Sequence, residues 1–100
     1  RDRRDILLNA LREKCSNILI PQQTDAGMHI LADFKNGISD RLAHLELLKS
    51  GIDSLPLSIY YDGPAERQAL VLGFSGVQKK VIPQLVSKMA AALNSFHTNK

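Results

Sequence analysis

Two hydrophobic periodicities alternate along this chain, and their order limits the folds it can adopt. Apolar residues spaced three and four apart, as on one buried face of a helix, occur in 5–19, after Asp40 and in 79–96. Strand-like alternation or a short apolar run occurs in 28–34, 55–61 and 69–74. The order helix, strand, helix, strand, strand, helix predicts an α+β fold. We expect a two-layer sandwich, with a small sheet of about three strands, at least partly antiparallel, and helices on one face.

The first and last helices have clear buried stripes and clear limits. In 5–19 the apolar stripe includes Cys15, and Pro21 is expected to end the helix because a proline disfavours helical backbone in the residue before it. In 79–96, Pro83 is acceptable only within the first turn. The expected stripe of this last helix is Ile82, Leu85, Val86, Met89, Leu93 and Phe96.

The middle helix has recognisable signals at both ends. Ser39 or Asp40 can cap its start by accepting a hydrogen bond from a free backbone N–H. Gly51 suits a left-handed cap at its end, with Ile52 folding back on the helix. The expected buried face is Leu42, Leu45 and Leu48, with Ala43 and Leu47 beside it.

The strand segments are separated by turn-forming residues. In 28–34 the alternation predicts that Met28, Ile30, Ala32 and Phe34 face the core. Residues 22–27 are polar and turn-like, and Lys35-Asn36-Gly37 is a second turn. Pro56 belongs at the start of its strand or on a sheet edge, because proline cannot donate to a strand ladder. Asp62-Gly63-Pro64 is a strong turn signal before the last strand.

Length and composition predict one domain over residues 1–100. The chain has 100 residues, of which 44% are hydrophobic and 23% charged, and its apolar runs are far shorter than the roughly 20 residues of a transmembrane helix. A single cysteine and no signal-peptide pattern favour a cytoplasmic compartment. Because the chain starts at Arg1 rather than methionine, we expect it to be part of a longer protein.

The charge pattern argues against nucleic-acid contact by this chain. The formal net charge is only +3, and the cations are scattered rather than gathered in a stripe that would neutralise several phosphates. There is no tryptophan, and no aromatic residue lies among the cations to stack on bases.

One cluster of polar residues is a candidate ligand-binding site. Ser58 and Tyr60 end one predicted strand and Arg67 leads into the next, so a short loop would bring them to one rim of the sheet. A guanidinium binds a carboxylate with two parallel hydrogen bonds. The alternative is that Arg67 is a solvated loop charge, paired with Glu66 or Asp62, and that Tyr61 packs in the core.

The remaining polar residues predict neither a metal site nor a nucleophile. His29, His44 and His97 are far apart, and with one cysteine they give no metal-ligand spacing. Cys15 is expected to pack in the core, because a reactive thiol needs an accessible, electropositive setting. We therefore predict no catalytic residue.

Three motifs in order resemble a known family. Residues 26–30 (AGMHI), 56–61 (PLSIYY) and 69–75 (ALVLGFS), followed by a long helix, resemble the C-terminal end of MocR-type regulators of the GntR family. The helix containing Arg3-Arg4-Asp5-Ile6-Leu7 and Leu11 also resembles the helix that leads into this subdomain. In this family a winged helix-turn-helix is fused to a body like a fold-type I aminotransferase that binds pyridoxal 5′-phosphate.

The resemblance implies a role that depends on a longer protein. The cofactor lysine, the cofactor-phosphate contacts and the winged helix that binds DNA would lie before Arg1, so this chain should hold no cofactor, catalyse nothing and bind no DNA. Its partners would be the remainder of its own chain, a second copy in a homodimer, and an amino-acid or vitamin B6-type effector. It would close over the cofactor pocket of the regulator.

Two other functions remain open. The chain resembles equally the small subdomain of a true pyridoxal-phosphate-dependent aminotransferase. In such enzymes an arginine that grips the substrate carboxylate lies three residues before the aromatic of the last strand, where this chain has Val71, and Arg67 is the nearest candidate. A free-standing small-molecule-binding module is the third hypothesis; it requires the chain alone to bind a ligand, which we do not expect.

Overall fold

Four strands form one antiparallel sheet in the order β1-β2-β4-β3. The computed structural model describes residues 2–22, 29–74 and 76–98, so the predictions for Met28, the preceding turn and the side chain of His97 lie outside the described part. The elements are α1 (Asp2–Lys14), β1 (Leu19–Gln22), β2 (His29–Phe34), α2 (Asp40–Lys49), β3 (Leu55–Pro56), the 3-10 helix η1 (Leu57–Tyr60), β4 (Ala69–Gly73), the 3-10 helix η2 (Lys79–Val81) and α3 (Ile82–Thr98). The α+β class is confirmed, but the sheet has four strands rather than about three.

The additional strand, β1, lies where the sequence predicted the end of the first helix. The helix ends at Lys14, and the chain then turns, with the Cys15 carbonyl accepting hydrogen bonds from the N–H groups of Ile18 and Leu19. The prediction of a helix to residue 19 was therefore wrong. Ile18 and Leu19 become buried at the sheet instead, and Pro21 is tolerated because β1 is an edge strand.

The predicted strand 55–61 is also shorter than expected. Only Leu55 and Pro56 pair with β4, and the chain then continues as η1. The reason is local: the Ser58 N–H donates to the Asp40 carboxylate at 2.9 Å, so a side chain takes the donor that a strand ladder would use.

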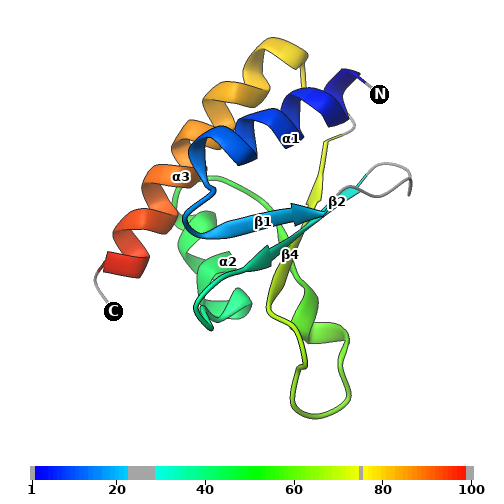
Figure 1. Ribbon diagram of the computed structural model, residues 1–100, viewed down its shortest axis with the longest axis vertical. Coiled ribbons are helices and arrows are strands. Elements are labelled where there is room, and N and C mark those ends of the chain that lie inside the picture. The colour runs from blue at the N-terminus through cyan, green and yellow to red at the C-terminus, as the bar shows by residue number, and fades with distance from the viewer. Residues whose placement is uncertain (1, 23–28, 75, 99–100) are drawn as a thin grey trace.

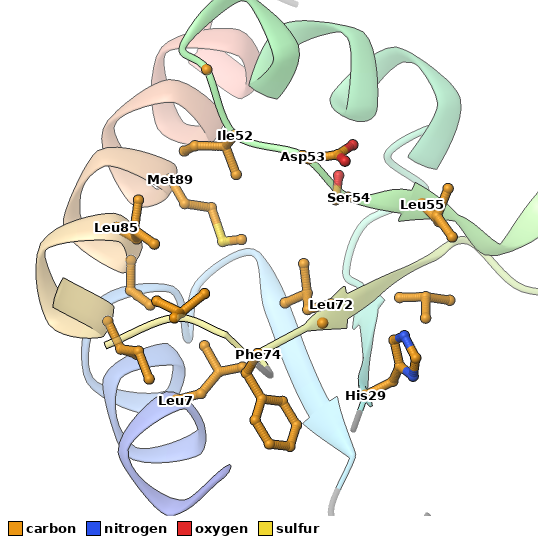
Figure 2. Close-up of a pocket in the computed structure, with 16 residues that line it drawn as sticks. Leu7, His29, Ile52, Asp53, Ser54, Leu55, Leu72, Phe74, Leu85 and Met89 are labelled. Atoms are coloured by element: carbon orange, nitrogen blue, oxygen red, sulfur yellow. The ribbon is translucent and has the colours of Figure 1, made fainter. Parts of the chain in front are cut away.

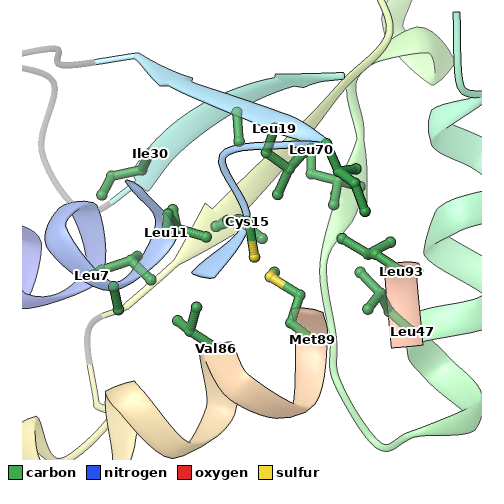
Figure 3. Close-up of a cluster of buried hydrophobic side chains, with 14 of the residues drawn as sticks. Leu7, Leu11, Cys15, Leu19, Ile30, Leu47, Leu70, Val86, Met89 and Leu93 are labelled. Atoms are coloured by element: carbon green, nitrogen blue, oxygen red, sulfur yellow. The ribbon is translucent and has the colours of Figure 1, made fainter. Parts of the chain in front are cut away.

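The core lies on one face of the sheet, as predicted. Ile30 and Ala32 of β2 stand opposite Leu72 and Leu70 of β4, and all four side chains are buried. Helices α1 and α3 lie side by side over this face (Figure 1). Figure 3 shows their contribution to the core beside α2 and the strands: Leu7, Leu11, Val86, Met89 and Leu93.

Helix α2 turns a different face to the core from the one its leucines predict. Leu42, Leu45 and Leu48 are 49%, 55% and 45% exposed, whereas Ala43 and Leu47 are fully buried. Asp40 is buried on the same side as Ala43 and Leu47, because its carboxylate accepts backbone hydrogen bonds from η1 and β4. The rotation of α2 is therefore set by a polar residue, and the predicted leucine face was wrong.

The predicted ends of α2 are confirmed. The Ser39 hydroxyl accepts a hydrogen bond from the Leu42 N–H, and Gly51 has a φ of 78°, the left-handed conformation that glycine adopts without strain. The Ile52 N–H donates back to the Leu47 carbonyl, and the Ile52 side chain packs against the core.

Polar contacts tie α1 to α3. The Lys14 ammonium donates to the Ser87 hydroxyl at 2.6 Å and to the Pro83 carbonyl at 3.1 Å, and Arg3 Nε donates to the Val77 carbonyl at 2.7 Å. Pro83 lies in the first turn of α3, as predicted. Within the expected stripe of α3, Leu85 is the exception, because it is 36% exposed.

Candidate functional site

The three residues predicted to share a ligand site belong to separate surroundings. Strands β3 and β4 are neighbours, as the loop between them suggested. Tyr60, however, is 66% exposed, while Ser58 is buried and its hydroxyl donates to Asp40 Oδ1 at 2.5 Å. The guanidinium of Arg67 donates to Asp33 rather than to either of them. The ligand role of the three remains a prediction.

Arg67 forms a two-pronged ion pair with Asp33 of β2. Arg67 Nε donates to Asp33 Oδ1 at 3.0 Å, and one terminal nitrogen donates to both carboxylate oxygens at 2.7 and 2.8 Å. Gln22 of β1 donates to Asp33 Oδ2 at 2.7 Å. The loop-charge alternative named Glu66 or Asp62 as the partner; the observed partner is Asp33, whose position on the outward side of its strand was the available signal. A carboxylate thus already occupies the guanidinium fork that the site prediction assigned to a ligand.

This ion pair lies on the sheet face opposite the core. Pairing places Ile20 opposite Asp33, and Leu31 and Leu55 on either side of Val71, all pointing away from the core. We call these five residues the open sheet face. Ile20 and Leu55 are 47% and 43% exposed, which is unusual for paired strand residues of this size. The open sheet face offers an apolar surface edged by a fixed charge pair.

A second polar cluster surrounds the fully buried carboxylate of Asp40. It accepts the N–H groups of Ser58 and Ala69 at 2.9 and 3.1 Å as well as the Ser58 hydroxyl, while Arg41 Nε donates to that hydroxyl at 3.2 Å. The Asp40 N–H donates to the Gln68 side chain at 2.8 Å. Buried carboxylates are tolerated when they are hydrogen-bonded in this way. The cluster fixes α2, η1 and β4 to one another, whereas the local sequence pattern predicted only a helix-capping role for Asp40.

A cavity of about 440 Å³ opens beside the end of β4. Figure 2 shows Ile52, Leu85 and Met89 on one side of it and Leu72 and Phe74 on the other. The polar residues of its lining are His29, Asp53 and Ser54. This cavity was not predicted, because its walls come from segments far apart in the sequence.

Cys15 packs in the core beside Met89 (Figure 3), which confirms the packing prediction. Burial raises the pKa of its thiol from 9.0 to about 11, while the nearby Lys14 ammonium lowers it by a smaller amount. A deprotonated thiolate is therefore disfavoured in the folded protein, and Cys15 does not have the properties of a nucleophile.

The raised thiol pKa makes stability depend on pH in the alkaline range. Because the folded-state pKa exceeds the unfolded value, the contribution is fully present below pH 9 and is lost as the pH rises through 11. Between these values we expect the wild type to lose about 2 kcal/mol of unfolding free energy beyond the loss of a Cys15→Ala variant. Urea unfolding at both pH values measures this difference, and equal losses would exclude a buried protonated thiol.

The described residues do not build a metal or pyridoxal-phosphate site. No group of three or more His, Cys, Asp or Glu side chains among them could hold a metal ion. No lysine of the described part lines the cavity; Lys14 and Lys35, for example, donate to Ser87 and to the Ser16 carbonyl at the surface. None of the helices that the structure describes has the length and apolar character of a membrane-spanning segment.

The fold is that of one part of the aminotransferase chains. The structure superposes on the alpha-aminoadipate aminotransferase of Thermus thermophilus, solved with N-(5′-phosphopyridoxyl)-L-leucine, with a TM-score of 0.83 over 96% of this chain, at 16% identity. It superposes on an archaeal alanine:glyoxylate aminotransferase with a TM-score of 0.81 over 94%, at 26% identity. The chain covers 25% and 23% of these two proteins.

Among curated proteins, the chain is similar to the probable rhizopine catabolism regulatory protein MocR of Rhizobium meliloti. The two are 22% identical over 98 residues, which is 98% of this chain and 20% of that protein. No family model matches the chain. These findings confirm the resemblance that the motifs predicted, and they are consistent with a small C-terminal subdomain of a MocR-type protein.

Proposed function

We propose that this chain is the C-terminal subdomain of a MocR-type transcription regulator, in which it closes over a pocket for pyridoxal 5′-phosphate. The observation that carries the proposal is the match to a MocR protein over 98% of this chain, which is only 20% of that protein. The aminotransferase fold supports the cofactor, because a solved relative holds a phosphopyridoxyl compound. The cofactor site would belong to the remainder of the longer protein, and this subdomain would not catalyse a reaction.

The open sheet face is the surface we assign to contact with the remainder. Its exposed Ile20 and Leu55 would leave water on docking, and the hydrophobic effect favours their burial. An effector that contacts both parts would stabilise the closed arrangement through its higher affinity for it. DNA would be bound only through the N-terminal winged helix, and the regulator would be a cytoplasmic homodimer that responds to an amino-acid or vitamin B6-type effector.

Arg67 is proposed to bind the effector carboxylate in exchange for Asp33. In the longer protein, Arg67→Ala should weaken a carboxylate-bearing effector about 10- to 100-fold, the size of a two-pronged charged hydrogen-bond pair. Asp33→Ala should strengthen the effector, because it frees the guanidinium fork. Calorimetric titration measures both, with Lys49→Ala on the exposed surface of α2 as the matched loss of a cation. Unchanged affinity in Arg67→Ala would remove Arg67 from the site.

The second candidate is the small subdomain of a true aminotransferase, which the solved relatives favour. The two candidates predict different behaviour of the longer protein. A regulator binds its promoter DNA with an affinity that changes with the effector, whereas an enzyme turns over an amino donor and a keto acid. Sustained transamination without any DNA binding would contradict the regulator.

A further inference from the structure

The cavity beside β4 carries an inference that does not depend on the proposed function. Its walls are formed by side chains that are themselves almost fully buried: Leu7, Leu72, Phe74, Ile82, Val86 and Met89. The opening therefore extends into the core between the sheet and the helices instead of lying on a flat surface. Its volume of about 440 Å³ is within the range of small-molecule sites.

One polar group in the lining has no hydrogen-bond partner. Ser54 is only 4% exposed, and its hydroxyl oxygen forms no hydrogen bond with any described residue. A buried hydroxyl without a partner costs folding free energy and is uncommon in native proteins. A donor on a bound molecule would satisfy this oxygen.

The charges near the opening favour a neutral molecule. Asp53 is exposed in the lining, and the Lys88 ammonium lies 4.0 Å from the position of a Cβ built on Gly51, which is also in the lining. These two exposed charges have opposite signs and are screened by water, so they select no net charge. The apolar walls exclude a strongly hydrated group.

We propose that this cavity binds a small neutral aromatic molecule with one hydrogen-bond donor, its ring between the apolar walls and its donor on Ser54 Oγ. An aromatic ring suits walls that contain Phe74 and the thioether of Met89, both of which make favourable contacts with rings. Apolar cavities of about 150 Å³ already bind benzene. This cavity has room for a bicyclic ring, and for such molecules it reverses the sequence-based expectation that the chain alone binds nothing.

The test compares indole with 1-methylindole, which has nearly the same shape and lacks the N–H donor. Indole should shift the methyl resonances of Met89 and Leu85 in a saturable way in NMR titration of the 100-residue chain. 1-Methylindole should bind about three- to tenfold more weakly, the contribution of one hydrogen bond. Absence of a saturable shift, or equal binding of the two compounds, would overturn the proposal.

Three variants locate the binding and its donor contact. Ser54→Ala should make the two compounds equal and raise the melting temperature of the free chain, because the unpartnered hydroxyl is gone. Leu85→Trp should fill the opening and abolish binding, while Leu45→Trp on the exposed face of α2 should retain it. Retained binding in Leu85→Trp contradicts the proposal. So do Met89 shifts that depend on protein concentration without indole, because a second copy would then occupy the cavity.

Discussion

Asp40→Ala is expected to lower the free energy of unfolding by about 3–5 kcal/mol, the largest effect of any polar substitution we predict. The variant leaves the N–H groups of Ser58 and Ala69 and the Ser58 hydroxyl buried without their acceptor. It also releases α2 from η1 and β4, which this carboxylate holds together. Urea unfolding followed by circular dichroism measures the change.

Two matched variants separate the hydrogen bonds of Asp40 from general effects of the substitution. Asp40→Asn keeps one acceptor oxygen and should cost less than Asp40→Ala. Asp62→Ala removes a carboxylate from the exposed loop after η1 and should change stability by no more than about 0.5 kcal/mol. A loss below about 1 kcal/mol in Asp40→Ala would show that the carboxylate does not organise this part of the fold.

Leu47→Ala is expected to cost about 2–5 kcal/mol, because Leu47 is fully buried and the truncation leaves a cavity in the core. Leu45→Ala, two residues earlier in the same helix, should cost no more than about 0.5 kcal/mol, because Leu45 is 55% exposed. Helix propensity is the same in both substitutions, so the difference reports burial alone. A larger loss in Leu45→Ala would mean that α2 buries the leucine face predicted from its sequence.

Local sequence signals predicted most of the architecture. The period of the apolar residues located α1, β2, α2, β4 and α3, and the chemistry of Ser39, Gly51 and Pro83 located helix ends. These signals work because capping, left-handed turns and proline geometry depend on neighbouring residues only. The motifs 56–61 and 69–75 also led to the family resemblance that the comparisons confirmed.

The errors arose where residues distant in the sequence decide the structure. Ser58 lies 18 residues from Asp40, and its hydrogen bond ended β3 and rotated α2 away from the leucine face. Asp33 is 34 residues from Arg67, so no local pattern identified it as the partner of the predicted ligand-binding arginine. The strand β1 was missed because Pro21 indicates a helix end as readily as an edge strand.

The exposed apolar residues have two different meanings. Ile20 and Leu55 belong to the open sheet face that we assign to the remainder of a longer protein. Leu42, Leu45 and Leu48 lie on the outer face of α2, and nothing in the described residues covers them. Apolar residues in groups of this kind favour association, so the purified chain should be checked for self-association before stability is compared between variants.

The central claim is that this chain is a pocket-closing subdomain whose cofactor is held by the rest of a longer protein. The most direct measurement is the amount of pyridoxal 5′-phosphate that remains per molecule after desalting. The longer protein should retain one equivalent, and the 100-residue chain should retain no more than the same chain unfolded in urea, where only nonspecific lysine adducts form. One equivalent retained by the folded chain alone would contradict the claim.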